Sequence, residues 1–283
     1  MTAAAPSVGV PVPPRPGRAA RLGGSLRRSV PAVVTFVAVI VVWELFASAA
    51  PRPRIFPPPT EIAAALVNNW GAGRWPLFEA ARTTLFEAVG GLVIGTTVGL
   101  IVAFGVARWA NARDAVLPVA IAANAIPIIA IAPIFNAWFG VTNPLSKMMI
   151  AALLVFFPVM INVTRGLSQV DPAALELMRS YAASEWAILR RVRIPNALPF
   201  FLTALKVATT LSLIGAIVGE YFGGASGVIG RVVVQSASAL RFDVTWAAII
   251  LGAVAGIAFY LAVVLLERVL IPWHPSVRGD EHT

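Results

Sequence analysis

The residue types that carry enzymatic or metal chemistry are scarce in this chain. Its 283 residues include no cysteine, which excludes thiol chemistry and metals bound by cysteine. The only histidines, His274 and His282, lie in the polar C-terminal tail. The Gly-x-x-x-x-Gly-Lys-Ser/Thr loop that cradles nucleotide phosphates is missing, so the chain has no evident means of binding ATP itself. The sequence therefore offers no convincing set of residues for an enzyme active site.

Polar side chains inside long apolar segments are a second source of candidates. Such residues are costly in lipid and usually face a helix-bundle interior. For four of these residues a structural role stays open beside contact with substrate. Lys206 and Glu220 could extend to the membrane surface. Asn124 and Asn136 could join helices by hydrogen bonds. Glu44 is expected to be paired or close to the interface and is assigned no further role. The candidates for lining a path through the membrane are Asn124, Asn136, Asn162, Lys206, Glu220 and Tyr221.

Six charged residues lie within positions 176–199, between two long apolar segments. Asp171-Pro172 predicts the start of a helix before it, because an N-cap carboxylate is followed by proline at the first helical position. The apolar residues that follow recur at i, i+3, i+4 and i+7, which predicts an amphipathic helix with one apolar stripe. That stripe consists of Ala174, Leu177, Met178 and Tyr181.

A second short helix is expected directly after the first. Ser184 can cap it, with Glu185 near its positive end, and Pro195 is expected to close it. Pro199 then begins the next apolar segment. Two short amphipathic helices held between membrane segments indicate a surface onto which another protein docks. We term residues 171–199 the docking loop.

The composition places the rest of the chain in a membrane. Hydrophobic residues make up 58%, charged residues only 12%, and the mean hydropathy is +0.82, whereas soluble domains are about 25% charged. The net charge of +9 does not indicate nucleic-acid binding, because the basic residues lie beside apolar segments instead of forming one face. We expect an all-α protein with a single domain that uses the bilayer in place of a soluble core.

Six apolar segments are long enough to cross a bilayer, at 30–50, 84–107, 116–139, 147–163, 200–222 and 246–267. Glycines at four-residue steps in the second and fifth predict close helix packing, and three prolines predict a broken third span. We predict a disordered cytoplasmic tail over 1–29, a six-helix domain over 30–270 and a cytoplasmic tail over 271–283. Lys and Arg are more frequent on the side of the docking loop, which predicts that this side and both termini are cytoplasmic.

The spacing within the docking loop matches a known motif. Glu176 is followed by Ala182-Ala183-Ser184 and Trp186, and Val192-x-Ile194-Pro195-x-Ala197-Leu198-Pro199 closes the stretch. This pattern resembles the EAA loop of ABC importer permeases. Leu177-Met178 replaces the Ala-Ala of the family, and Ala182 stands where the family has glycine. Whether the turn between the two helices needs a positive φ is therefore open, because alanine adopts one only at a cost.

The resemblance covers about residues 55–270 and implies the fold of type I ABC importer permeases. It implies the membrane subunit of an ATP-driven importer in a bacterial plasma membrane, with no cofactor of its own, since ATP and magnesium belong to the partner. The implied partners are two ABC ATPase subunits, a second permease copy, an external substrate-binding protein and the lipid membrane. The implied ATPase-coupling residues are Glu176 and Arg179 as polar contacts, Tyr181 and Trp186 as apolar anchors, and Ser180, Ala182, Ala183, Ser184, Ile194, Pro195, Leu198 and Pro199.

Two further runs narrow the resemblance. Phe56-Pro57-Pro58-Pro59-Thr60-Glu61-Ile62 and residues 214–221 resemble the branch that handles nitrate, sulfonates, taurine, thiamine-pyrimidine precursors or riboflavin. Tyr221, Phe222 and the lack of a deep arginine favour a small organic nutrient over an inorganic ion. The alternative is a secondary transporter or channel that works alone. It would show an acidic or proton-relay pair deep in the membrane and two inverted halves, and neither is evident in the sequence.

Overall fold

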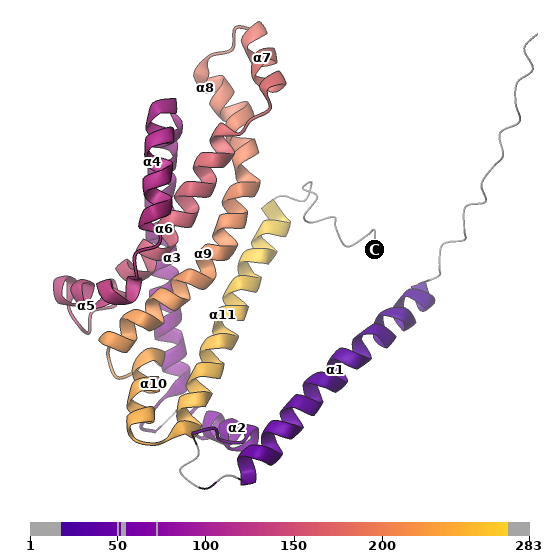
Figure 1. Cartoon of the computed structure of the whole chain (residues 1–283), viewed down its shortest axis with the longest axis vertical. Coiled ribbons are helices and arrows are strands. Elements are labelled where there is room, and N and C mark those ends of the chain that lie inside the picture. Colours follow the sequence, from indigo (N-terminus) through magenta and orange to yellow (C-terminus); the bar gives the residue numbers. More distant parts are fainter. Residues whose placement is uncertain (1–17, 50, 52–54, 72, 271–283) are drawn as a thin grey trace, which may run out of the picture. The chain divides into compact units, whose positions relative to one another are not determined.

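The computed structural model describes residues 18–49, 51, 55–71 and 73–270, and every regular element among them is a helix (Figure 1). Within this part of the chain, five helices are long and apolar enough to cross a membrane, and the number rises to six when a bent pair of shorter helices counts as one span. The chain forms two compact units, Met1–Arg52 with Pro58–Thr60 and Pro53–Pro57 with Glu61–Thr283.

The first unit contains α1 (Arg18–Ala49), whose residues 30–49 form the first apolar span. Residues 18–29 are helical, where the sequence predicts a disordered tail, and residues 1–17 lie outside the described residues. Alanine, arginine and leucine favour helix, so the apolar helix extends backwards through them. Glu44, expected to be paired, accepts hydrogen bonds from the Thr60 N–H (3.1 Å) and hydroxyl (2.7 Å). Its carboxyl group thus caps the start of α2 (Pro59–Asn68).

The core of the second unit consists of four long helices, α3 (Leu77–Ala107), α6 (Pro144–Ser168), α9 (Ile194–Phe222) and α11 (Phe242–Leu270). α6 packs against both α3 and α9. A Cβ added to Gly95 would lie 2.5 Å from the Ala152 carbonyl oxygen, and one on Gly215 would lie 2.7 Å from the Ala151 Cα. Backbones this close leave no room for side chains, so the glycine stripes pack the helices as their spacing predicts.

The predicted third span is two helices, α4 (Ala110–Ala123) and α5 (Ile128–Phe139), bent by 93° with respect to each other (Figure 1). The break lies directly before Pro127, while Pro118 and Pro133 lie inside the helices. The expectation that all three prolines interrupt the span is therefore wrong for two of them. A proline disfavours the helical conformation of the residue before it, and at Ile126 this coincides with the end of a turn.

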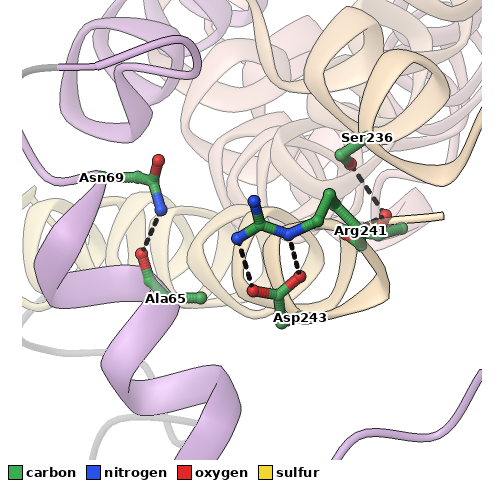
Figure 2. Close-up of polar contacts among 6 residues, drawn as sticks. Ala65, Asn69, Ser236, Arg241 and Asp243 are labelled. Carbon is green, nitrogen blue, oxygen red and sulfur yellow. Dashed lines mark hydrogen bonds and ion pairs between the residues drawn. The ribbon is translucent and has the colours of Figure 1, made fainter. Parts of the chain in front are cut away.

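The segment between the fifth and sixth predicted spans contains a further helix, α10 (Ile229–Ser238). Its end is closed by a left-handed residue, Leu240, with φ of 57°, and the Arg241 N–H donates to the Ser236 carbonyl (2.8 Å). Figure 2 shows the Arg241 guanidinium donating two hydrogen bonds to Asp243, at 3.0 and 2.8 Å. The turn from α10 into α11 is thus held by backbone and side-chain contacts together.

Candidate functional site

The docking loop forms two short helices next to one end of α6 and α9, as its sequence predicts (Figure 1). α7 (Pro172–Ser180) begins where Asp171 Oδ1 accepts a hydrogen bond from the Ala173 N–H (2.9 Å). α8 (Glu185–Ile188) begins where Ser184 Oγ accepts one from the Ala187 N–H (3.3 Å). These side chains satisfy amides that have no partner within their own helix. Both predicted caps are confirmed.

The turn between α7 and α8 passes through the left-handed region at Ala182, whose φ is 51°. The Ala182 N–H donates to the Arg179 carbonyl (2.9 Å), and the Ala183 N–H donates to the Met178 carbonyl (3.1 Å). A residue with a Cβ pays roughly 1–2 kcal/mol for this conformation. The turn therefore needs a positive φ, and the chain meets that need with a residue poorly suited to it.

We expect Ala182→Gly to stabilise the docking loop by about 1 kcal/mol, because glycine adopts a positive φ without steric cost but is more flexible when unfolded. The measurement is amide hydrogen exchange in α7 and α8, which should slow about fivefold. Ala183→Gly is the matched control, since no positive φ occurs at that position, and it should bring no slowing. Equal or faster exchange in Ala182→Gly would contradict the account of the turn.

The docking loop exposes large apolar side chains next to charged ones. Leu177, Tyr181 and Trp186 are 57%, 76% and 68% exposed. The four residues of the predicted stripe differ in exposure, because Ala174 and Met178 are half-buried while Leu177 and Tyr181 are exposed. Of the predicted coupling residues in this part, Glu176, Arg179, Ser180, Ala182 and Ser184 are exposed and Ala183 is half-buried. Apolar groups exposed in a polar surround are typical of an interaction site.

Pro195 does not close the second helix, contrary to expectation. The helix continues from α8 through a π-helical turn, Leu189–Arg193, into α9. In this turn the Ile194 N–H donates to the Leu189 carbonyl, five residues back instead of four. The wider turn gives room where Pro195 lacks an N–H and its ring would crowd the preceding turn. Pro199 lies inside α9 and not at its start, so the docking loop is continuous with that helix.

Asn196, which was not selected from the sequence, joins the two helices that flank the docking loop. Its Nδ2 donates to the carbonyl oxygens of Gly166 (2.7 Å) and Gln169 (3.0 Å) at the end of α6. Carbonyl groups at a helix end lack partners within the helix, so this amide satisfies two of them. A Cβ on Gly166 would lie 2.8 Å from the Ala197 Cα, which shows how closely α6 and α9 approach here.

A cavity of ≈ 530 Å³ lies between α8 and the end of α3. Trp186 and Leu189 line it from the docking loop, and Arg108 and Arg193 bring two basic groups to its wall. Glu185 adds a carboxyl group. The surface beside Trp186 is thus concave, apolar and bordered by charges, which suits the contact of a protein partner.

Two of the candidates for a path through the membrane, Asn136 and Lys206, make hydrogen bonds that join helices of the bundle. Asn136, 3% exposed, donates to the Gly219 carbonyl (3.3 Å) and accepts from the Ser146 hydroxyl (2.9 Å). Lys206 donates to both carboxyl oxygens of Glu267 (3.0 and 2.9 Å), so it joins α9 to α11 instead of extending to the surface.

Three other candidates have different surroundings. Asn162 donates to the Pro158 carbonyl of its own helix (2.8 Å). Asn124 follows α4 and lines a small cavity of ≈ 50 Å³. Tyr221 is 53% exposed, next to the fully buried Glu220.

Within the described part of the chain, three buried charged residues were missed in the sequence: Glu87, Lys147 and Glu267, the partner of Lys206. Glu87 and Lys147 are 3% and 1% exposed, and both lie next to Glu220. Glu87 lies inside a predicted span, so the rule that selected Glu220 could have found it. Lys147 begins a predicted span, where a charged residue is ordinary. The acidic pair of Glu87 and Glu220 is a feature that the sequence does not reveal, because 133 positions separate its members.

Residues 95–273 match the family described as binding-protein-dependent transport system inner membrane component. The chain is 30% identical over 238 residues to the formylaminopyrimidine transport permease protein ThiX of Halalkalibacterium halodurans, covering 84% of this chain and 93% of the relative. It is 27% identical over 252 residues to the taurine transport system permease protein TauC of Escherichia coli, covering 86% and 90%.

A third relative and a solved structure agree with these two. The riboflavin transport system permease protein RibX of Chloroflexus aurantiacus is 29% identical over 244 residues, covering 86% of this chain and 90% of the relative. A solved chain of an amino acid ABC transporter superposes with a TM-score of 0.54 at 20% identity, covering 69% of this chain and 94% of that chain. That likeness concerns the fold.

Proposed function

This chain belongs to the family of binding-protein-dependent transport system inner membrane components, and from that premise we propose that its docking loop receives the force of a cytoplasmic ATPase. The chain is a permease subunit of an ATP-driven ABC importer, a non-catalytic component whose ATPase is a separate partner. The observation that carries the proposal is the exposed trio Leu177, Tyr181 and Trp186, presented by two capped helices at the ends of α6 and α9.

Contact with the ATPase combines apolar anchors and polar partners. Tyr181 and Trp186 place aromatic groups in a cleft of the ATPase, where exclusion of water makes such side chains dominate binding. Glu176 and Arg179 supply polar contacts around them. The remaining coupling residues shape the loop. Ser180 ends α7, and Ala182, Ala183 and Ser184 lead from it into α8. Ile194 and Pro195 begin α9, and Leu198 and Pro199 lie within it.

Movement of the docking loop acts on two membrane helices at once. Asn196, in the first turn of α9, donates hydrogen bonds to carbonyl oxygens at the end of α6. The π-helical turn makes α8 continuous with α9. Closure of the ATPase pair would thus displace α6 and α9 together and bias the permease between inward and outward states. The loop transmits only as much free energy as its contacts differ between those states.

The assembly that fits this role contains two copies of the permease, two ATPase subunits that hold ATP and magnesium, and an external binding protein. The docking loop and both termini face the cytoplasm of a bacterial cell, in keeping with the excess of Lys and Arg on that side. Substrate would pass between the two permease copies. Asn124, Asn136, Asn162, Lys206, Glu220 and Tyr221 remain the candidates for its path.

The substrate class we propose is a small organic nutrient. The relatives carry names for transport of formylaminopyrimidine, riboflavin, aliphatic sulfonates and taurine, and a more distant one is named for nitrate import. The binding protein supplies the selectivity in this proposal, so its ligand, measured by calorimetry, identifies the transported compound.

The docking assignment is tested by retention of the ATPase. Permease with Tyr181→Ala and Trp186→Ala is expected to reach the membrane at normal abundance. The amount of ATPase that copurifies with it should be at least tenfold lower than with the wild type, because aromatic anchors account for most of the binding energy. The matched control is Trp138→Ala, since Trp138 is 73% exposed on α5, away from the docking loop. Full retention of the ATPase by the double variant would exclude these helices as the docking surface.

A further inference from the structure

The ends of α6 and α9 opposite the docking loop meet in a cluster of buried charged residues. Lys147 lies in the first turn of α6, Glu220 lies near the end of α9, and Glu87 of α3 lies beside both. Their exposed fractions are 1%, 0% and 3%. Ionisable groups at such depth are costly and are usually kept for a role.

Lys147 supplies the positive charge of the cluster and is itself held by hydrogen bonds. Its Nζ donates to the Val141 carbonyl oxygen and to the Ser146 hydroxyl (2.9 Å). Ser146 in turn donates to Asn136 of α5, which donates to the Gly219 carbonyl of α9. The ammonium offsets part of the cost of burying two carboxyl groups, and its own hydrogen bonds belong to a network that spans α5, α6 and α9.

The acidic side of the cluster reaches the first turn of α10. Val228, the N-cap residue, makes no side-chain cap, so the first amides of this helix depend on other partners. The Ile229 N–H donates to Thr84 Oγ1 of α3 (3.0 Å), and the Gly230 N–H donates to Glu220 Oε2 of α9 (2.7 Å). Both cap groups therefore come from membrane helices, and both residues are fully buried.

The contact between Glu220 and the N-terminus of α10 is close, and a carboxyl group suits the positive end of a helix. A Cβ on Gly230 would lie 2.6 Å from the Glu220 Cβ and 2.7 Å from the Ile217 carbonyl oxygen, so only glycine allows the approach. An acidic side chain at a helix N-terminus is favoured by the helix dipole, more so where water is absent. α10 is thus fastened at its N-terminal end by Thr84 and Glu220.

We propose that Thr84 and Glu220 form a clamp, supported by the positive charge of Lys147 and with Glu87 beside it, that couples the position of α10 to the ends of α6 and α9 farthest from the docking loop. When the docking loop moves α6 and α9, α10 at their opposite ends therefore moves with them. The clamp itself goes beyond the proposed function, and only its use in force transmission rests on that proposal.

The clamp is tested by the accessibility of a single cysteine on α10. The chain has no cysteine, so Val232→Cys, at a position 0% exposed, introduces the sole thiol. In the full-length permease in membrane vesicles we expect slow labelling by a water-soluble maleimide. Adding Glu220→Leu or Thr84→Val should accelerate labelling at least tenfold, because each removes the acceptor of a buried amide. Ser236→Cys, also fully buried, serves as a second reporter.

Two matched variants separate the clamp from general loosening of the bundle. Glu220→Gln keeps an acceptor for the Gly230 N–H and should keep labelling near the wild-type rate. Lys206→Met removes a partly buried ion pair elsewhere in the bundle, between Lys206 of α9 and Glu267 of α11, and should also leave the thiol protected. Protection of the thiol in Glu220→Leu and Thr84→Val, or equal acceleration by Lys206→Met, would overturn the clamp.

Transmission is tested separately in proteoliposomes with the ATPase and binding protein. The Glu220→Leu variant should retain the ATPase. The increase in ATP hydrolysis that the liganded binding protein causes should be at least tenfold smaller than in the wild type. Full stimulation in that variant would overturn the coupling of α10. Failure of the wild type to retain the ATPase would instead count against the docking assignment and leave the labelling result standing.

Discussion

Replacing Glu176 with lysine is expected to reduce ATP-dependent uptake at least tenfold while leaving the permease in the membrane at normal abundance. Glu176 is exposed on α7 beside Leu177 and Arg179, so the change affects contacts with a partner and not the packing of the helix. A reversed charge against a complementary surface converts attraction into repulsion, and like-charge contacts at an interface cost several kcal/mol. Uptake by vesicles and quantitative immunoblotting of the membrane fraction measure the two quantities.

The matched control is Glu79→Lys. Glu79 is an exposed glutamate in the first turn of α3, at the end of the bundle away from the docking loop, where it pairs with Arg82 at 2.8 Å. That pair is exposed and contributes little to stability, so we expect near-normal uptake. Normal uptake in Glu176→Lys at normal abundance would remove the docking loop from the coupling path. A loss in both variants would indicate a general effect of added positive charge.

Replacing Gly95 with alanine is expected to destabilise the permease by about 1–3 kcal/mol, the usual cost of forcing an extra group into a packed core. The added Cβ would lie 2.5 Å from the Ala152 carbonyl oxygen and 2.7 Å from the Val155 Cβ, and neither a backbone atom nor a packed branched side chain can move away cheaply. α3 and α6 would have to separate along the stripe that holds them together. The measurement is thermal unfolding of the purified permease in one detergent.

Gly105→Ala provides the comparison in the same helix. A Cβ on Gly105 meets nothing within 4 Å, so this alanine adds helix propensity without a clash. We expect its unfolding temperature to equal or exceed that of the wild type. An unchanged unfolding temperature in Gly95→Ala would show that α3 and α6 are not packed as closely as described.

The sequence alone determined the features that depend on near neighbours. Asp171 and Ser184 mark helix starts because a side chain two or three residues before an amide can satisfy it, and both caps are present. The apolar segments are long enough to imply membrane spans from length and hydropathy, and glycines four residues apart lie on one helix face. These properties depend only on short segments of the sequence. The all-helical fold and the two short helices of the docking loop could therefore be inferred before any tertiary contact was known.

Only the tertiary structure decided which distant residues meet. Pro195 was expected to stop a helix, yet a π-helical turn absorbs it because α9 is held in place by α6. Asn196 meets a carbonyl oxygen 30 positions away, and Glu220 lies beside residues of α3 and α6. Such contacts depend on how helices are placed around one another, which no local period or cap encodes. The two capped helices with exposed apolar side chains could therefore be predicted from the sequence, whereas the buried contacts of Glu220 at the other end of α9 could not.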